Sequence, residues 1–200
     1  MRADAQRNRE LIATTALDLL ARRGPAVSME EIARAAGLGV GTLYRHFPDR
    51  QSLLDSVAAT TLRTLLAAGR AEVSSPAPRW QVLVRILERC AGLPLALITS
   101  LTDATRVDPT IADLVEELNA LFQGLAEAAQ REGSLRADLT GPQVVGLLNV
   151  AVCRPGARPD DPLTTVLLDG LRARRQPPAD TPPAVSPASR SHPRRDPAGH

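Results

Sequence analysis

The 200-residue sequence contains no lysine, few aromatic residues and only two cysteines. Without lysine it cannot supply the Gly-Lys-Ser/Thr element that a Walker loop needs to bind phosphate. Cys90 and Cys153 lie in apolar helical patterns without CxxC or Cys/His spacing, so two reduced core thiols are favoured over a metal or redox site. All 24 basic residues are arginine. This indicates a coding bias more than a nucleic-acid partner.

Long hydrophobic segments are also missing. The longest apolar run, at about residues 93–100, is too short to cross a bilayer. The first ten residues, MRADAQRNRE, have no apolar stretch from which a signal peptide could be built. We therefore expect a soluble cytoplasmic protein. Its hydrophobic content of 44% is sufficient for the core of one or two domains.

Strand-like alternation is missing as well, whereas apolar residues recur every three or four positions almost throughout. This periodicity predicts an all-α fold with about nine helices. Polar caps, glycines and prolines set the expected boundaries. The helices are expected at residues 4–23, 29–36, 40–47, 50–73, 79–91, 94–104, 109–133, 141–153 and 162–175, with Arg172, Arg174 and Arg175 at the C-terminal end of the last.

Three glycines alternate at positions 37, 39 and 41, within the stretch AAGLGVGTLYRHF at residues 35–47. A dinucleotide-binding loop needs GxGxxG directly after a strand, but these glycines follow a predicted helix and have a different spacing. The preceding SMEE, residues 28–31, is typical of a capping box in which Ser28 and Glu31 begin a short helix. Two short helices joined by a glycine turn predict a helix-turn-helix.

A helix-turn-helix places its second helix in the major groove of DNA, with the N-terminal residues nearest the base edges. Gly39 and Gly41 lack side chains, so they would let this end of the helix approach the duplex closely. Leu43 and Phe47 would anchor the opposite face in the core. The side chains that offer hydrogen-bonding groups to DNA are Thr42, Tyr44, Arg45 and His46.

The segment VSMEEIARAAGLGVGTLYRHFPDRQSLL, residues 27–54, resembles the DNA-binding domain of the TetR family of bacterial transcriptional regulators. The resemblance rests on the Ile-Ala-x-x-Ala-Gly helix, the Gly-Thr-Leu-Tyr-x-His-Phe recognition helix and the basic residue after it, all in matching order and spacing. The DNA-binding residues that it implies are Ser28, Gly39, Val40, Gly41, Thr42, Tyr44, Arg45, His46 and Arg50.

Individual roles within this set also follow from the resemblance. Arg45 occupies a variable position often used to recognise bases, and Arg50 matches a phosphate-binding position. Ser28 matches a capping position that can also touch the DNA backbone. Taken singly, each residue has an alternative role: a packing aromatic for Tyr44, a helix cap or core residue for His46, and a solvated charge for Arg50. Their arrangement on one short helix after a glycine turn favours DNA binding.

The C-terminal half, with RWQVLVRILERC at residues 79–90, is similar to the SbtR-like branch of the family. The resemblance implies an effector pocket between its helices and a dimer formed by the last two helices. The candidate pocket residues are Trp80, Thr99, Thr102, Asp103, Arg106, Phe122 and Asn149. The candidate interface residues are Val144, Leu147, Leu148, Val152, Leu163, Val166, Leu167 and Leu171. The alternatives are surface or packing roles for the first set and closure of the monomer core for the second.

Three segments are expected along the chain. Residues 1–50 form the DNA-binding domain, residues 51–175 form the effector-binding and dimerisation domain, and residues 176–200 form a disordered tail rich in proline, alanine and arginine. The formal charge is +2 over residues 1–50, −4 over residues 51–169 and +4 over residues 170–200. The tail arginines could add electrostatic affinity for DNA, although a solvated extension without function is the simpler interpretation.

The implied function is that of a homodimeric repressor that binds near-palindromic double-stranded operator DNA in the bacterial cytoplasm and nucleoid. A small-molecule effector, unidentified, would release it. The scarcity of aromatic residues favours an aliphatic or mixed polar effector over a flat polyaromatic one. The alternatives are a constitutive DNA-binding or scaffold dimer without an effector, and an enzyme. We expect no catalytic residues, metal or cofactor, because two of the three histidines lie in the tail.

Overall fold

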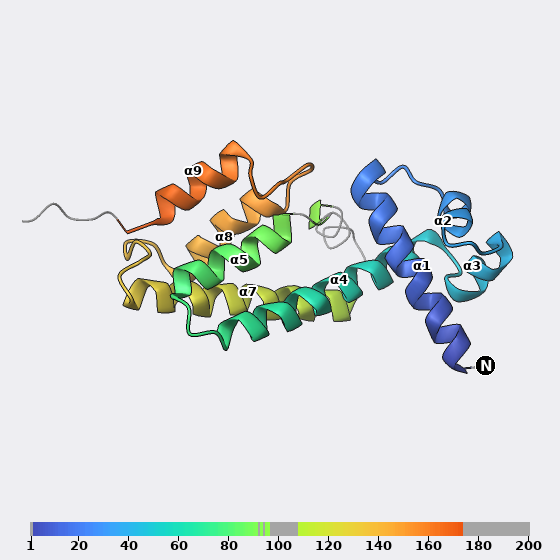
Figure 1. Ribbon diagram of the computed structural model, residues 1–200, viewed down its shortest axis with the longest axis horizontal. Helices are drawn as coiled ribbons and strands as arrows, with labels where there is room; N and C mark the ends of the chain where they lie inside the picture. The colour runs from blue at the N-terminus through green and yellow to red at the C-terminus, as the bar shows by residue number, and fades with distance from the viewer. Residues whose placement is uncertain (1, 92, 94, 97–107, 174–200) are drawn as a thin grey trace, which may run out of the picture.

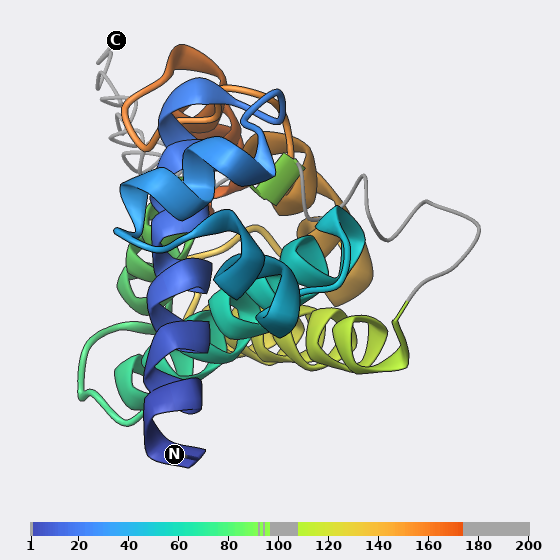
Figure 2. The same cartoon turned by 90° about the vertical axis from the view of Figure 1, so that its right-hand side faces the viewer.

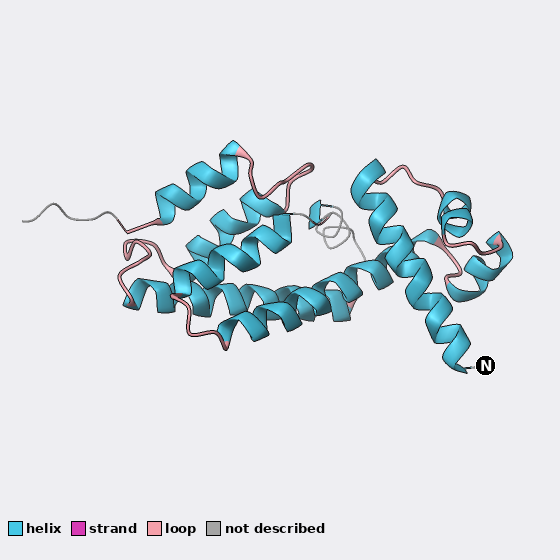
Figure 3. Ribbon diagram, viewed as in Figure 1, coloured by secondary structure: helices cyan, strands magenta, loops and turns pink. Residues whose placement is uncertain are grey.

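The computed structural model describes residues 2–91, 93, 95–96 and 108–173. The regular elements of this part of the chain are eight α-helices (Figure 1, Figure 3). They are α1 (Arg2–Arg23), α2 (Met29–Ala35), α3 (Val40–His46), α4 (Arg50–Val73), α5 (Arg79–Ala91), α7 (Pro109–Arg131), α8 (Gly141–Val152) and α9 (Pro162–Leu171). The all-α prediction is therefore confirmed. The helix expected at residues 94–104 lies almost entirely outside the described residues.

Helices α1, α2 and α3 form a small N-terminal domain around the first turns of α4 (Figure 1, Figure 2). One apolar cluster holds it together, because each helix presents its apolar positions to the same centre. The buried members of this cluster are Ile12, Ala13, Ala16, Val27, Met29, Ile32, Ala33, Leu43, Phe47, Leu53 and Val57. The two short helices contribute few turns of their own, so their orientation depends on packing against each other and against α1.

Helix α4 belongs to both halves of the molecule. Its first turns supply Leu53 and Val57 to the N-terminal cluster, and its later turns supply Leu62 and Leu66 to a second, larger cluster. Figure 1 shows α4 leaving the N-terminal domain and running beside α7. Gly69 permits their close approach, since a Cβ there would lie 2.5 Å from Leu121 Cδ2. A displacement of α4 relative to α7 would therefore be transmitted to the N-terminal domain.

The C-terminal domain is built in layers over α4 and α7. Helices α5 and α8 pack against α7, and α9 lies on α8 as the outermost layer (Figure 1). Proline follows an aspartate cap at the start of α7 and α9, where Asp108 and Asp161 accept hydrogen bonds from the first-turn amides of Thr110 and Thr164. These starts were predicted from the Asp-Pro pairs.

The last helix is shorter than predicted. It ends at Leu171 and not near residue 175, because Arg172 takes an extended conformation and the chain pairs with the segment after α7. The Arg136 amide donates to the Leu171 carbonyl at 3.0 Å, and the Ala173 amide donates to the Ser134 carbonyl at 3.1 Å. The prediction that Arg172 lies inside the helix end was therefore wrong. Arg174, Arg175 and the tail at 176–200 lie outside the described residues.

The described residues contain no candidate membrane-spanning helix. None of their helices combines the length and the apolar character that crossing a bilayer requires.

Candidate nucleic-acid interface

The first helix of the helix-turn-helix begins with the predicted capping box. The Glu31 amide donates to Ser28 Oγ at 3.1 Å, and the Ser28 amide donates to Glu31 Oε2 at 2.9 Å. Arg23 adds an ion pair to the other carboxylate oxygen at 2.7 Å. The hydrogen bond from the Ser28 backbone, followed by the bond from Arg23, lowers the pKa of the Glu31 carboxyl. Ser28 is half-buried, and its hydroxyl is engaged in the cap.

The turn between α2 and α3 depends on one glycine. Gly37 has a φ of 68°, in the left-handed region that favours glycine, and the next amide, of Leu38, donates back to the Ala33 carbonyl at 2.9 Å. Gly39 then caps α3 with extended backbone angles. Apart from the adjacent residues and the backbone of α3, no heavy atom lies within 4 Å of the position of a Cβ at Gly39 or Gly41. This end of α3 is therefore an open surface of bare backbone.

Helix α3 has one buried and one exposed face. Leu43 and the C-cap residue Phe47 are fully buried in the N-terminal core. Val40 and Tyr44 are 37% and 41% exposed, and Arg45 is exposed beside them. An exposed valine and tyrosine on a short helix are apolar surface without a partner in the described chain, as expected of a surface that contacts another molecule.

Arg45 lies along its own helix in this structure. Its Nε donates to the Gly41 carbonyl at 3.3 Å and its Nη2 donates to Thr42 Oγ1 at 3.0 Å. The guanidinium is thereby held beside the bare N-terminal turn of α3. Both contacts are solvent-exposed, so a stronger bidentate acceptor could replace them.

Two other arginines contact the backbone of the helix-turn-helix or of the loop before it. Arg50, the first residue of α4, donates through its guanidinium to the carbonyls of Pro25 and Val27 in the loop between α1 and α2. Arg9 of α1 donates from Nη1 to the carbonyl of His46 at 2.8 Å. Neither backbone contact was predicted, because both join residues more than twenty positions apart.

Comparisons with known proteins agree with this geometry. Residues 12–57 match the model of bacterial regulatory proteins of the tetR family, and residues 80–173 match that of the C-terminal domain of SbtR-like transcriptional regulators. A crystal structure of a TetR transcription regulatory protein from Mycobacterium vanbaalenii is 32% identical in sequence, with 86% of this chain and 98% of that chain covered and a TM-score of 0.62. The chain belongs to the TetR family.

Two further relatives support the assignment. The structure of a TetR transcriptional regulator from Streptomyces coelicolor is 25% identical, covers 83% of this chain and 99% of that one, and has a TM-score of 0.62. A helix-turn-helix-type transcriptional regulator of Staphylococcus aureus is 44% identical over 59 residues. That match spans 28% of this chain and 30% of the relative. The chain therefore matches less than a third of the length of this curated relative, while the likeness over most of the chain comes from the solved structures.

Three of the candidate effector residues of this TetR-family protein lie among the described residues: Trp80, Phe122 and Asn149. Phe122 is buried in the C-terminal core, and Asn149 is partly buried and donates to Asn119 Oδ1 at 3.3 Å. Trp80, at the start of α5, belongs to the same buried cluster as Phe122. Thr99, Thr102, Asp103 and Arg106 lie outside the described residues. The described part of the chain therefore supports packing for Phe122 and leaves the pocket predicted around these residues as a prediction.

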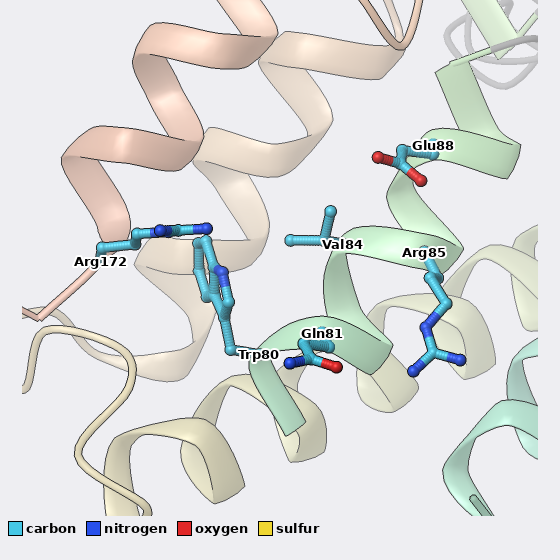
Figure 4. Close-up of a pocket in the computed structure, with 6 residues that line it drawn as sticks. All are labelled: Trp80, Gln81, Val84, Arg85, Glu88 and Arg172. Atoms are coloured by element: carbon cyan, nitrogen blue, oxygen red, sulfur yellow. The ribbon is translucent and has the colours of Figure 1, made fainter. Parts of the chain in front are cut away.

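An open pocket of about 260 Å³ lies beside Trp80, between α5 and the end of α9 (Figure 4). Figure 4 shows the Arg172 guanidinium reaching over the indole, at 5.7 Å from the ring centroid. Trp80 is 6% exposed, and its Nε1 has no hydrogen-bond partner within the described residues. Gln81, Arg85 and Glu88 line the rest of the pocket. Of the candidate effector residues that the structure describes, Trp80 alone lines this pocket.

The candidate interface residues divide into two groups. Val144, Leu148, Val152 and Leu171 are at most 3% exposed and lie in the core of the C-terminal domain, although Leu171 also lines the groove between α8 and α9. In contrast, Leu147, Leu163 and Val166 are 39%, 45% and 71% exposed. Leu167 is partly buried, and together these four line an apolar groove of about 340 Å³ between α8 and α9. Val150, 61% exposed, was missed, although its spacing of three residues from Leu147 places it on the same side of α8.

Proposed function

We propose that this TetR-family protein is a homodimeric, sequence-specific operator-binding repressor whose affinity for DNA falls when a small molecule binds its C-terminal domain. The observation that carries the proposal is the exposed face of α3. Its N-terminal turn is bare backbone at Gly39 and Gly41, and Tyr44 and Arg45 stand exposed next to it. Such a helix end fits the major groove, where the first residues of a recognition helix meet the base edges.

The residues of this surface have distinct proposed roles. Arg45 would exchange its contacts with Gly41 and Thr42 for a bidentate contact with a guanine edge, which offers two acceptors in the same plane. Thr42, Tyr44 and His46 would contact phosphates or bases near it. A phosphate contact by Arg50 would compete with its hydrogen bonds to Pro25 and Val27.

A second copy of the chain is the proposed occupant of the apolar groove between α8 and α9. The exposed Leu147, Leu163 and Val166 line one groove, and the exposed Val150 lies on the same side of α8 as Leu147. Two α8–α9 pairs facing each other across a two-fold axis would bury these residues in a four-helix bundle. The dimer would then present two recognition helices to the two halves of a near-palindromic operator.

The effector is proposed as the source of regulation. Because α4 belongs to both apolar clusters, a ligand that favours one placement of α4 against α7 would favour one placement of α3. DNA affinity would fall by the ratio of the ligand's affinities for the two states. The second candidate, a constitutive DNA-binding dimer, is favoured by the burial of Phe122 in the C-terminal core, where the prediction had placed it beside a ligand. Both candidates are non-enzymatic and act on DNA in the bacterial cytoplasm.

Selection of binding sites from random duplex DNA, at a stated salt concentration, tests the proposal. An enriched inverted repeat is the expected outcome. Adding candidate aliphatic and polar ligands to the bound complex then separates the two candidates, since release by any of them supports regulation. A folded, dimeric protein that enriches no sequence, with or without these ligands, would contradict the operator-binding function.

A further inference from the structure

We propose that Arg9 is a positioning residue for the recognition helix: from α1 it holds the C-terminal end of α3 and so sets the angle at which α3 meets DNA. The inference rests on the proposed function, since positioning has a consequence only if α3 binds DNA. The Arg9 side chain touches the backbone carbonyl of His46 and the ring of Phe47, and not the side chains proposed to contact DNA. No role for Arg9 follows from the motif that identifies the helix-turn-helix.

Two contacts of Arg9 converge on the same point. Its Nη1 donates to the carbonyl of His46, the last residue of α3, at 2.8 Å. Its guanidinium carbon lies 4.3 Å from the centroid of the ring of Phe47, the C-cap residue. Phe47 is fully buried in the N-terminal cluster, and Arg9 is half-buried. The guanidinium therefore covers the Phe47 ring and also donates a hydrogen bond to the last residue of α3.

This location suits a cation that stabilises a helix end. The carbonyls of the last turn have no partners within the helix and carry the negative end of the helix dipole, so a guanidinium donor there is stabilising. Flat stacking on an aromatic ring together with a directed hydrogen bond is a geometry of arginine more than of lysine. Partial burial strengthens both contacts relative to the same pair in water.

The contact matters because α3 cannot hold its own position. It has seven residues, which is shorter than helices that are stable alone. Its buried residues Leu43 and Phe47 fix its depth in the core, and α2 packs on it more extensively than α1 does. Removal of Arg9 would leave the hydrophobic anchor in place and release the orientation of the helix around it.

The first test is amide hydrogen exchange across the full-length protein, for which no operator is needed. Arg9→Ala should speed exchange of the α3 amides by about tenfold, the scale of losing one charged hydrogen bond, while the amides of α5 and α7 keep their rates. Arg9→Lys should have a smaller effect, because the charge remains. Arg22→Ala is the matched control, since Arg22 is on the same helix and pairs with Asp18 one turn away.

The second test uses the operator selected by the wild-type protein. Arg9→Ala should lower the ratio of operator to random-DNA affinity by about tenfold or more and leave the salt dependence of binding unchanged, because no phosphate contact is lost. The ratio of operator to random-DNA affinity should be higher in Arg9→Lys than in Arg9→Ala, because the positive charge is kept. If the wild type selects no operator, the proposed function fails, and the exchange experiment still decides whether Arg9 positions α3.

Three results would overturn the inference. Unchanged exchange in α3 would show that Arg9 does not hold the helix. Faster exchange by an equal factor in every helix would assign it a general stabilising role. A fall of about 1.8 in the slope of log affinity against log salt, one phosphate contact for each subunit of a dimer, would make Arg9 a direct DNA contact.

Discussion

Arg45 and Arg50 carry the same charge, five positions apart, in different surroundings. Arg45 lies on the exposed face of α3 and contacts only neighbours of its own helix among the described residues. Arg50 donates to two carbonyls of a loop more than twenty residues earlier in the sequence. Charge and spacing could not distinguish them, because the partner carbonyls are brought near Arg50 by the tertiary fold.

Arg45→Ala should impair recognition of the operator more than binding to DNA in general. Loss of a bidentate contact with a base costs about 1–3 kcal/mol, or roughly 5- to 150-fold in operator affinity. Affinity for random DNA should change much less. Fluorescence titrations of both DNAs at one salt concentration measure this. An equal loss on both would instead make Arg45 a phosphate contact.

Arg50→Ala should destabilise the N-terminal domain. Its two charge-assisted hydrogen bonds tie α4 to the loop after α1, and their loss is expected to lower the free energy of unfolding by about 2 kcal/mol. Urea denaturation in the absence of DNA measures it, with Arg63→Ala, on the exposed side of α4, as control. If Arg50→Ala leaves the free energy of unfolding unchanged but makes DNA affinity less dependent on salt concentration, the phosphate contact implied by the family resemblance is supported.

Glu31 should make stability depend on pH in the acid range. Hydrogen bonds from Ser28 and Arg23 lower its pKa from 4.5 in the folded state, so folding favours the ionised form. The stabilisation is present above pH 4.5 and is lost as the pH falls through the lower folded-state pKa. Denaturant midpoints measured between pH 7 and pH 3 should therefore fall less in Glu31→Gln than in the wild type. Parallel profiles for the two proteins would contradict this.

At the scale of helices, features set by local chemistry were predictable and features set by distant contacts were not. The capping boxes at Ser28 and the Asp-Pro starts of α7 and α9 lie within four residues of sequence and were predicted. The end of α9 depends on pairing between Leu135 and Arg172, and the contact of Arg9 with His46 spans 37 positions. No local pattern marks either.

The faces of α8 and α9 illustrate the same limit. Apolar spacing identified both helices, but it could not separate Val144 and Leu148, buried in the subunit, from Leu147 and Val166, exposed on the outer side. The two groups alternate within the same turns, and burial depends on where α5, α7 and α9 lie around α8. The three-dimensional arrangement narrows the proposed interface to the exposed members.

Val166→Asp should weaken the dimer. Val166 is the most exposed large apolar residue of the described chain, and a carboxylate in an apolar interface would be buried without a partner. The dimer dissociation constant should rise by at least about 100-fold, measured by sedimentation velocity across a concentration series. Thr165→Asp is the matched control, because Thr165 is exposed on the same helix but does not line the groove. Equal dimer dissociation constants for Val166→Asp and Thr165→Asp would show that the groove between α8 and α9 is not the interface.

At the scale of the whole molecule, one long helix joins two apolar cores. The N-terminal core fixes α3 through Leu43 and Phe47, the C-terminal core carries the exposed α8–α9 groove, and α4 contributes to both. In the proposed dimer, the groove sets the distance between two recognition helices and α4 transmits changes in that distance. Operator binding then depends on dimerisation, because both half-sites can be bound together only when the distance between the two recognition helices matches the distance between the half-sites.

The separation of the half-sites is the most direct test of this account. The operator obtained by selection is compared with the same sequence carrying five extra base pairs at its centre, which turns one half-site about half a helical turn away. The account predicts that affinity for the lengthened operator falls at least about 100-fold, toward the level of random DNA. Equal affinity for the two operators would contradict a rigid dimer that presents two recognition helices to one face of the duplex.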